Sequence, residues 1–149
     1  MSRYEATWPG GGHAVITDAD GVDAVLGPLH VAGQPVAVDV FRYREGRPAG
    51  GVQVGVGHPQ RSFVLYFGQP GGGYAVEPGV TAWEGDIEFS YGGQPTGYHP
   101  PETRITPERA LAAVRDLVAT DRRPTGVDWD ENTTDNEHGD ADPGDDPWD

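Results

Sequence analysis

Alternating apolar and polar positions recur along the first 130 residues and predict a series of short β-strands. In residues 52–56 three valines alternate with Gln53 and Gly55, which is typical of a strand with one buried face. Residues 62–67 are apolar on both faces and therefore predict a central strand. A clean alternation predicts a longer strand over residues 83–91. Further strands are predicted at residues 14–17, 36–43, 74–76 and 127–129.

Two helices are predicted from capping residues and apolar stripes. The stronger signal begins at Thr106, which we expect to cap a helix with Pro107 at its first position and Glu108 in its first turn. One apolar stripe then follows, formed by Ala110, Leu111, Val114, Leu117 and Val118. A shorter helix is predicted near the start of the chain, with Asp20 as its N-cap and Pro28 near its end.

These elements together predict an α+β fold. We expect a mainly antiparallel sheet of four to six strands, with one long C-terminal helix packed on one face and a short N-terminal helix. The predicted domain covers residues 1–130. Residues 131–149 are rich in acids, contain two prolines and have few apolar side chains. Such a composition cannot bury enough surface to fold, so we predict a disordered acidic tail.

The charge of the chain restricts its partners. The formal net charge is −14, from 24 acidic residues against ten arginines and no lysine. Eight of the acids lie in residues 131–149, which leaves 16 acids against ten arginines, or −6, in the predicted domain. A chain of this charge is repelled by nucleic acid and anionic lipid and is attracted to basic proteins. We therefore expect a protein partner, and neither nucleic acid nor a membrane.

Cysteine is absent, which excludes disulfides, thiolate metal ligands and a cysteine nucleophile. The N-terminus has no apolar segment of the kind that signal peptides contain, and no apolar run approaches the length of a membrane span. The sequence therefore predicts a cytoplasmic protein. It leaves the oligomeric state open.

No residue pattern predicts a catalytic or metal centre. Zinc-ligand spacing is not found among the histidines, which are His13, His30, His58, His99 and His138. Residues 18–21 begin like a calcium loop, but the glycine and glutamate that an EF-hand requires do not follow. None of the serines lies in a nucleophile-elbow motif. We expect no cofactor and no enzyme activity; the alternative is a small carboxylate-dependent hydrolase that uses Glu84 or Asp86.

The placement of acidic residues is the most informative feature of the sequence. No basic residue lies between Arg61 and Arg104, and this interval contains Glu77, Glu84, Asp86, Glu88 and Glu102. In a strand over residues 83–91, three of these acids would point the same way. Such a row either protects a sheet edge from pairing with another chain or presents an acidic face to a basic partner. The sequence favours neither interpretation over the other.

Aromatic residues accompany the acids in this interval. Trp83, Tyr91 and Tyr98 are candidates for exposed anchors beside an acidic face, because large aromatic side chains supply much of the binding energy at interfaces. A protein that acts on nucleic acid is a basic partner of this kind, since its substrate groove is positively charged.

The second half of the chain carries a series of recognisable motifs. They are GVQVGVG at 51–57, FVLYFG at 63–68, SYGG at 90–93, HPPETRITP at 99–107 and RRPTGVDW at 122–129. Together they resemble the first-numbered family of immunity proteins (Imm) of bacterial polymorphic toxin systems. The resemblance covers about half to two-thirds of the chain, and its most specific part is the C-terminal helix with the motif after it.

The resemblance implies an antidote encoded beside a secreted toxin of the deaminase or nuclease type. It supplies no catalytic residues. Arg122, Pro124 and Trp129 match its motif. We interpret residues 121–124, with Pro124, as the end of the helix and Trp129 as packing for the last strand.

The function predicted is therefore an immunity protein that binds and neutralises a cognate toxin domain by occluding its active site or substrate groove. The candidate toxin-binding residues are Glu77, Trp83, Glu84, Asp86, Glu88, Tyr91 and Tyr98. An adaptor or chaperone for a secretion cargo is the alternative.

Overall fold

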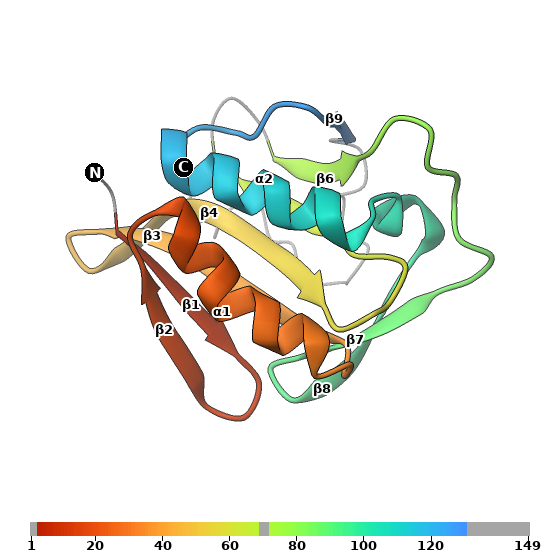
Figure 1. Cartoon of the computed structure of the whole chain (residues 1–149), viewed down its shortest axis with the longest axis horizontal. Coiled ribbons are helices and arrows are strands. Elements are labelled where there is room, and N and C mark those ends of the chain that lie inside the picture. Colours follow the sequence, from red (N-terminus) through yellow and green to blue (C-terminus); the bar gives the residue numbers. More distant parts are fainter. Residues whose placement is uncertain (1–2, 69–71, 131–149) are drawn as a thin grey trace, which may run out of the picture.

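The computed structural model describes residues 3–68 and 72–130 (Figure 1). Within them the chain forms nine strands in one sheet and two α-helices. The strands are β1 (Tyr4–Trp8), β2 (Gly12–Ile16), β3 (Val36–Arg44), β4 (Arg47–Val56), β5 (Val64–Phe67), β6 (Gly73–Val76), β7 (Ile87–Tyr91), β8 (Gln94–Tyr98) and β9 (Asp128–Asp130). The helices are α1 (Ala19–Val31) and α2 (Pro107–Thr120), with a short 3₁₀ helix, η1 (Pro100–Thr103), before α2. The predicted acidic tail at 131–149 lies outside the described residues.

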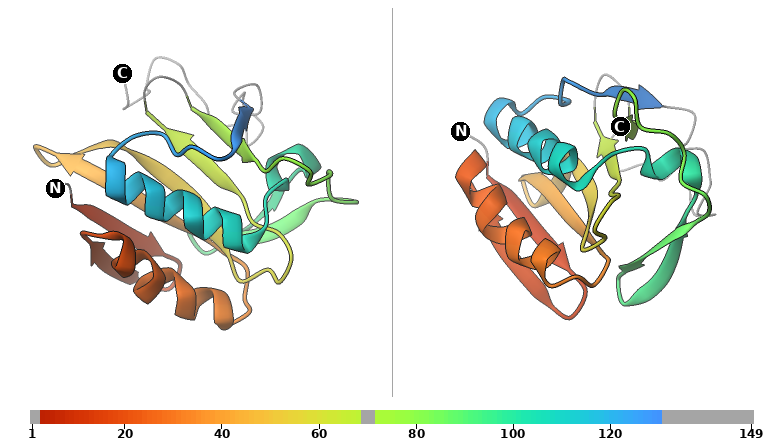
Figure 2. Two further views of the ribbon diagram at one scale, coloured as in Figure 1. Left: turned by 45° about the horizontal axis from the view of Figure 1, so that its top comes forward. Right: turned by 45° about the vertical axis from the view of Figure 1, so that its right-hand side comes forward.

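Seven strands lie side by side in the order β2-β1-β3-β4-β5-β6-β9, and each pair of neighbours is antiparallel. β7 and β8 form a hairpin that joins this sheet beside the start of β3, where Val36 aligns with Ser90. Both helices lie on one face of the sheet, and the hairpin lies away from them (Figure 2). The sheet is therefore covered on one face by helices and on part of the other by the hairpin.

The predicted fold is wrong in the size of the sheet, which has nine strands instead of four to six. The sequence pattern missed β1 and β8. β8 contains Pro95 and Gly97, which weaken a strand pattern, and it forms because Gly92 and Gly93 adopt positive φ angles that turn the chain back onto β7. β1 pairs with both β2 and β3, so tertiary pairing decides its conformation.

The single long helix is also a wrong prediction, because α1 has 13 residues against 14 in α2. The N-cap of α1 is Asp18, whose side chain accepts a hydrogen bond of 2.9 Å from the N–H of Gly21. The cap therefore precedes the predicted one, Asp20, by two residues. Pro28 lies inside the helix, which continues to Val31.

The start of α2 is confirmed as predicted. Thr106 is its N-cap and Pro107 its first residue. The end of α2 also falls where residues 121–124 predict it, because the helix stops at Thr120 and Asp121 caps it in a left-handed conformation with φ of 58°. Trp129 in β9 packs 5.7 Å from Tyr66 between ring centroids, which places it as packing for the last strand.

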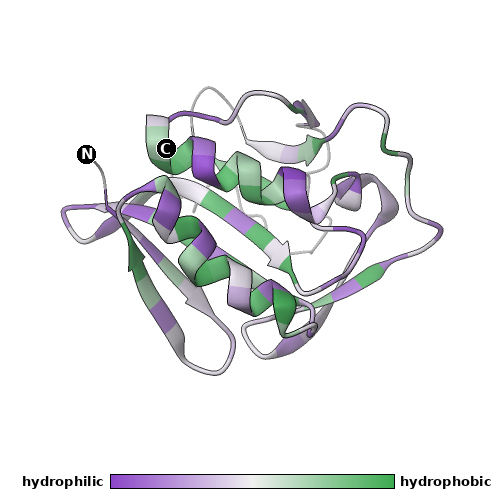
Figure 3. Cartoon of the chain, in the orientation of Figure 1, coloured by the Kyte–Doolittle hydropathy of each residue, from purple (hydrophilic) through white to green (hydrophobic). Residues whose placement is uncertain are grey.

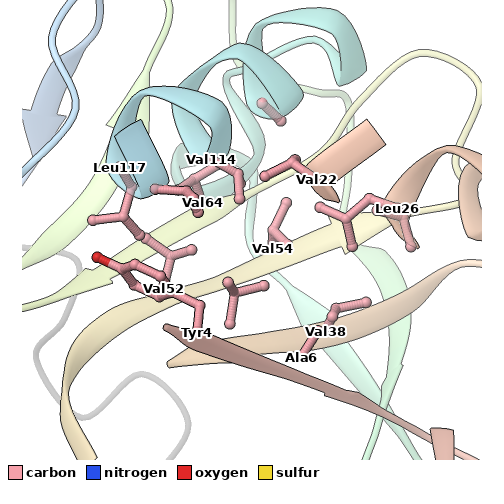
Figure 4. Close-up of a cluster of buried hydrophobic side chains, with 14 of the residues drawn as sticks. Tyr4, Ala6, Val22, Leu26, Val38, Val52, Val54, Val64, Val114 and Leu117 are labelled. Carbon is pink, nitrogen blue, oxygen red and sulfur yellow. The ribbon is translucent and has the colours of Figure 1, made fainter. Parts of the chain in front are cut away.

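Two hydrophobic clusters lie on opposite faces of the sheet. The larger lies between the sheet and the helices and includes Val52, Val54, Leu26 and Val114 (Figure 4). Apolar residues of α1 and α2 supply its helical side (Figure 3). The second cluster lies between the sheet and the hairpin and is mainly aromatic, with Phe63, Tyr74, Phe89 and Tyr98. β5 contributes Val64 to the first cluster and Leu65 to the second, so the prediction that it is apolar on both faces is confirmed.

Candidate partner-binding surfaces

Two of the three acidic residues in the predicted 83–91 strand lie outside the strand that the structure contains. β7 begins at Ile87, so Glu84 and Asp86 belong to the loop before it and only Glu88 lies in the strand. The prediction of a strand is therefore wrong for residues 83–86, and the three acids do not share one strand face. All three are nevertheless exposed and close in sequence. We name Glu84, Asp86 and Glu88 the acidic segment.

The strand begins late because its partner is short. β8 ends at Tyr98, and the chain continues into Pro100 and Pro101, which have no N–H to donate to a further ladder. Asp86 instead approaches the side chain of His99, with Oδ1 3.1 Å from Nδ1. This contact fixes the loop that carries the acidic segment against the start of η1.

Trp83 is held in place at the beginning of this loop. The Arg61 guanidinium lies over its ring at 4.9 Å, and the His58 ring meets it edge-on at 5.5 Å between centroids. Arg61 also donates hydrogen bonds to the carbonyl oxygens of Thr81, at 2.7 Å, and Thr103, at 3.2 Å. Burial, helped by the charge of Arg61, lowers the pKa of His58. The half-buried Trp83 therefore anchors the loop to the body of the domain.

Glu77 and Tyr98 make contacts within the domain. The Glu77 carboxylate accepts hydrogen bonds from the N–H and the hydroxyl of Thr106, at 2.9 and 2.8 Å, and so links the end of β6 to the start of α2. Tyr98 is 2% exposed and its ring stacks on Phe63 at 4.0 Å. Burial raises the pKa of its hydroxyl. Tyr98 is therefore buried in the second cluster, whereas Glu77 is part-buried with its carboxylate bonded to Thr106.

Tyr91 belongs to a second surface, on the face of the sheet opposite the helices, that sequence reasoning missed. Aligned residues of neighbouring strands form two rows here. One row consists of Val15, Glu5, Phe41, Gly51 and Phe67, and the next of His13, Thr7, Asp39 and Gln53. We name these rows, with Tyr43 and Tyr91, the open sheet face.

The open sheet face carries most of the exposed large apolar side chains of the described residues. Val15 is 41% exposed, Tyr43 42% and Tyr91 39%, and the fourth such residue, Val31, lies at the end of α1. The Tyr91 hydroxyl accepts a hydrogen bond of 3.2 Å from Gln53, which holds the tyrosine over the sheet. Exposed apolar side chains that gather in one place mark an interaction surface more often than scattered ones do.

Gly51 brings two aromatic rings together on this face. Phe41 and Phe67 lie on either side of it and meet edge-to-face at 5.7 Å between centroids. A Cβ at Gly51 would lie 2.6 Å from the Phe41 ring and 2.2 Å from the Val40 carbonyl oxygen. The glycine therefore creates an aromatic platform that spans three strands.

Asp39 lies beside this platform and is half-buried. Its Oδ1 is buried and has no hydrogen-bond partner among the described residues. Burial raises the pKa of its carboxyl group to about 6, and a hydrogen bond with Gln53 only partly opposes this. The sequence did contain a signal for it, because Asp39 interrupts the otherwise apolar run of residues 36–41.

Comparison with known protein families shows where the chain belongs. The model of the family described as "Immunity protein Imm1" matches residues 10–131 of the chain. This is a wider range than the motifs between residues 51 and 129 suggested. No curated protein and no solved structure matches the chain. In the part of the chain that the structure describes, no helix has the length and apolar character to cross a membrane, and no group of three or more His, Cys, Asp or Glu side chains is placed to hold a metal ion.

Proposed function

The chain belongs to the Imm1 family of immunity proteins, and from this premise we propose that it neutralises a cognate toxin of the deaminase or nuclease type by occluding its substrate groove. The family match over residues 10–131 carries the proposal. We expect the complex to form in the cytoplasm of the producing cell.

The acidic segment supports occlusion of a groove. Glu84, Asp86 and Glu88 are exposed, and five residues of chain span at most about 17 Å, so the three carboxylates fall within the width of one partner groove. A toxin that acts on nucleic acid needs a positively charged groove for the phosphates. Carboxylates on an anchored loop would occupy such a groove and speed the encounter. Trp83 and Tyr91 lie at either end of the segment and are the aromatic contacts that we assign to the interface.

Binding without turnover fits the surroundings of these carboxyl groups. A glycosidase holds its two carboxyl groups on either side of the bond that it cleaves. Glu84 and Asp86 lie on an exposed loop instead, which favours the immunity function over a carboxylate-dependent hydrolase. An adaptor for a secretion cargo differs from an antidote because it would bind a part of the cargo outside the toxic domain.

The experiment that tests the function uses the toxin domain encoded beside this gene. Co-expression with the chain should restore growth of cells that produce the toxin, and an inactivated toxin domain should bind the purified chain with nanomolar affinity or better. Binding to the cargo outside the toxic domain, without rescue from the isolated toxin domain, would instead establish an adaptor. Conversion of a small molecule by the chain alone would establish an enzyme.

Charge reversal tests the assigned surface. The triple variant E84K, D86K, E88K should slow association with the inactive toxin domain at low salt and weaken rescue, because it replaces attraction by repulsion. An association rate equal to that of the wild type at low salt would remove the acidic segment from the interface.

A matched control separates the effect of where the lysines lie from the effect of the change in net charge. The triple variant D20K, D23K, E45K makes the same change in net charge at exposed positions on α1 and on the β3–β4 turn. It breaks one surface contact, between Asp23 and Arg115, which contributes little to stability. This variant should associate faster than the acidic-segment variant, since only the latter places lysines in the groove.

A further inference from the structure

Asp39 is placed unusually for a carboxylate without a cation. Its ladder neighbours on the open sheet face are Thr7 on β1 and Gln53 on β4, which are both uncharged. No arginine of the described residues forms an ion pair with it, and its Oδ1 has no hydrogen-bond partner there. A half-buried carboxylate without a counterion is unfavourable, so the free protein carries an uncompensated negative charge at this point.

The residues around Asp39 indicate which kind of cationic group would bind there. Glu5, one row away, adds negative charge, although His13 lies 2.9 Å from its carboxylate. Phe41 in the adjacent row and Tyr91, held over Gln53, supply aromatic rings. Carboxylate and aromatic faces together suit a guanidinium group, because it forms charge-assisted hydrogen bonds in its plane and stacks on rings with its faces.

We propose that the open sheet face is a second toxin-contacting surface, where an arginine side chain of the toxin pairs with Asp39 and packs against Phe41 and Tyr91. This inference rests on the proposed immunity function. Tyr91 links the two surfaces, since it lies at the end of β7, three residues after Glu88 of the acidic segment. One toxin domain can thus contact the acidic segment and the open sheet face together.

The decisive variant is Asp39→Asn, which keeps the size of the side chain and removes its charge. It should weaken binding of the inactive toxin domain at least about tenfold, mainly through faster dissociation, because a desolvated charge pair acts on the dissociation rate. The same variant should be at least as resistant to urea as the wild type, because it removes an unpaired half-buried charge. Weaker binding by a protein that is no less stable excludes loss of folding as the cause.

Asp20→Asn is the matched control, since it removes one exposed charge on the helical face. It should leave the dissociation rate unchanged. Dissociation of Asp39→Asn within about twofold of the wild type would overturn the inference while the proposed function stood. If the wild-type chain fails to bind the toxin at all, the proposed function itself fails.

The free protein is also measured by sedimentation with and without the substitution. We expect a sedimentation coefficient that Asp39→Asn does not change. A self-associated wild type that dissociates in the Asp39→Asn variant would show that the face binds a second copy of this chain, and would overturn the assignment to the toxin.

Discussion

Single residues on the open sheet face show how function can oppose stability. A carboxyl group whose folded pKa lies above its unfolded value destabilises the folded state wherever it is ionised. For Asp39 the two values are about 6 and 3.8. Its charge therefore costs stability above about pH 6, and this cost disappears as the pH falls from about 6 to 4. A residue retained at such a cost is a candidate for a role in binding.

The first prediction concerns this pH dependence. The unfolding free energy of Asp39→Asn minus that of the wild type should be about 1 kcal/mol larger at pH 8 than at pH 4. This figure is reduced to allow for the solvent-exposed part of the carboxyl group. Urea unfolding of both proteins across this pH range measures it. A difference that stays constant between pH 4 and 8 would show that Asp39 does not titrate in the way its burial implies.

Gly51 carries the second prediction. Its φ of 149° and the absence of room for a Cβ should make Gly51→Ala less stable by about 3 kcal/mol, and the Phe41–Phe67 contact should be disturbed. Gly46→Ala is the control, because Gly46 also has positive φ but has open space around it, and it should lose only about 1 kcal/mol. Equal losses in thermal unfolding would mean that the backbone angle alone matters.

At the scale of elements, capping separates what the sequence could and could not predict. Thr106 stands directly before a proline and an apolar stripe, so the start of α2 was unambiguous. At α1 two aspartates lie two residues apart, and either could serve as N-cap. The structure places Asp18 there, with its carboxylate bonded to the Gly21 N–H.

This choice gives the third prediction. Asp18→Ala should lower the unfolding free energy by about 1 kcal/mol, because the N–H of Gly21 loses its side-chain partner. Asp20→Ala should cost only about 0.3 kcal/mol, from the helix dipole. Chemical denaturation of both variants at one pH provides the comparison, and the opposite order would restore Asp20 as the cap.

Strand pairing explains why the sheet was underestimated. Seven strands gave a local signal in the sequence, whereas β1 and β8 depend on neighbours that only the folded chain supplies. The same reasoning applies to the acidic segment, because an alternating pattern cannot say where the partner strand ends. Asp39 was missed because its half-buried position depends on the neighbouring strands β1 and β4, which a local pattern does not show.

At the scale of the whole molecule, negative charge is distributed between two regions with different expected roles. Within the described residues, the acidic segment and Asp39 are fixed on a folded scaffold, where position matters. The eight acids of residues 131–149 contribute more than half of the net charge of −14. Charge of this kind acts at long range on encounter rates and is weakened by salt.

Deletion of residues 131–149 is therefore the fourth prediction. The family match and β9 both end within one residue of position 130, so the shortened chain should keep its unfolding free energy within about 0.5 kcal/mol. Association with the inactive toxin domain should slow at low salt and match the full chain at high salt, with an unchanged dissociation rate. Stopped-flow measurements at both salt concentrations separate these contributions. Faster dissociation of the shortened chain would instead show that residues 131–149 contact the toxin directly, and a loss of cooperative unfolding would place the end of the domain beyond residue 130.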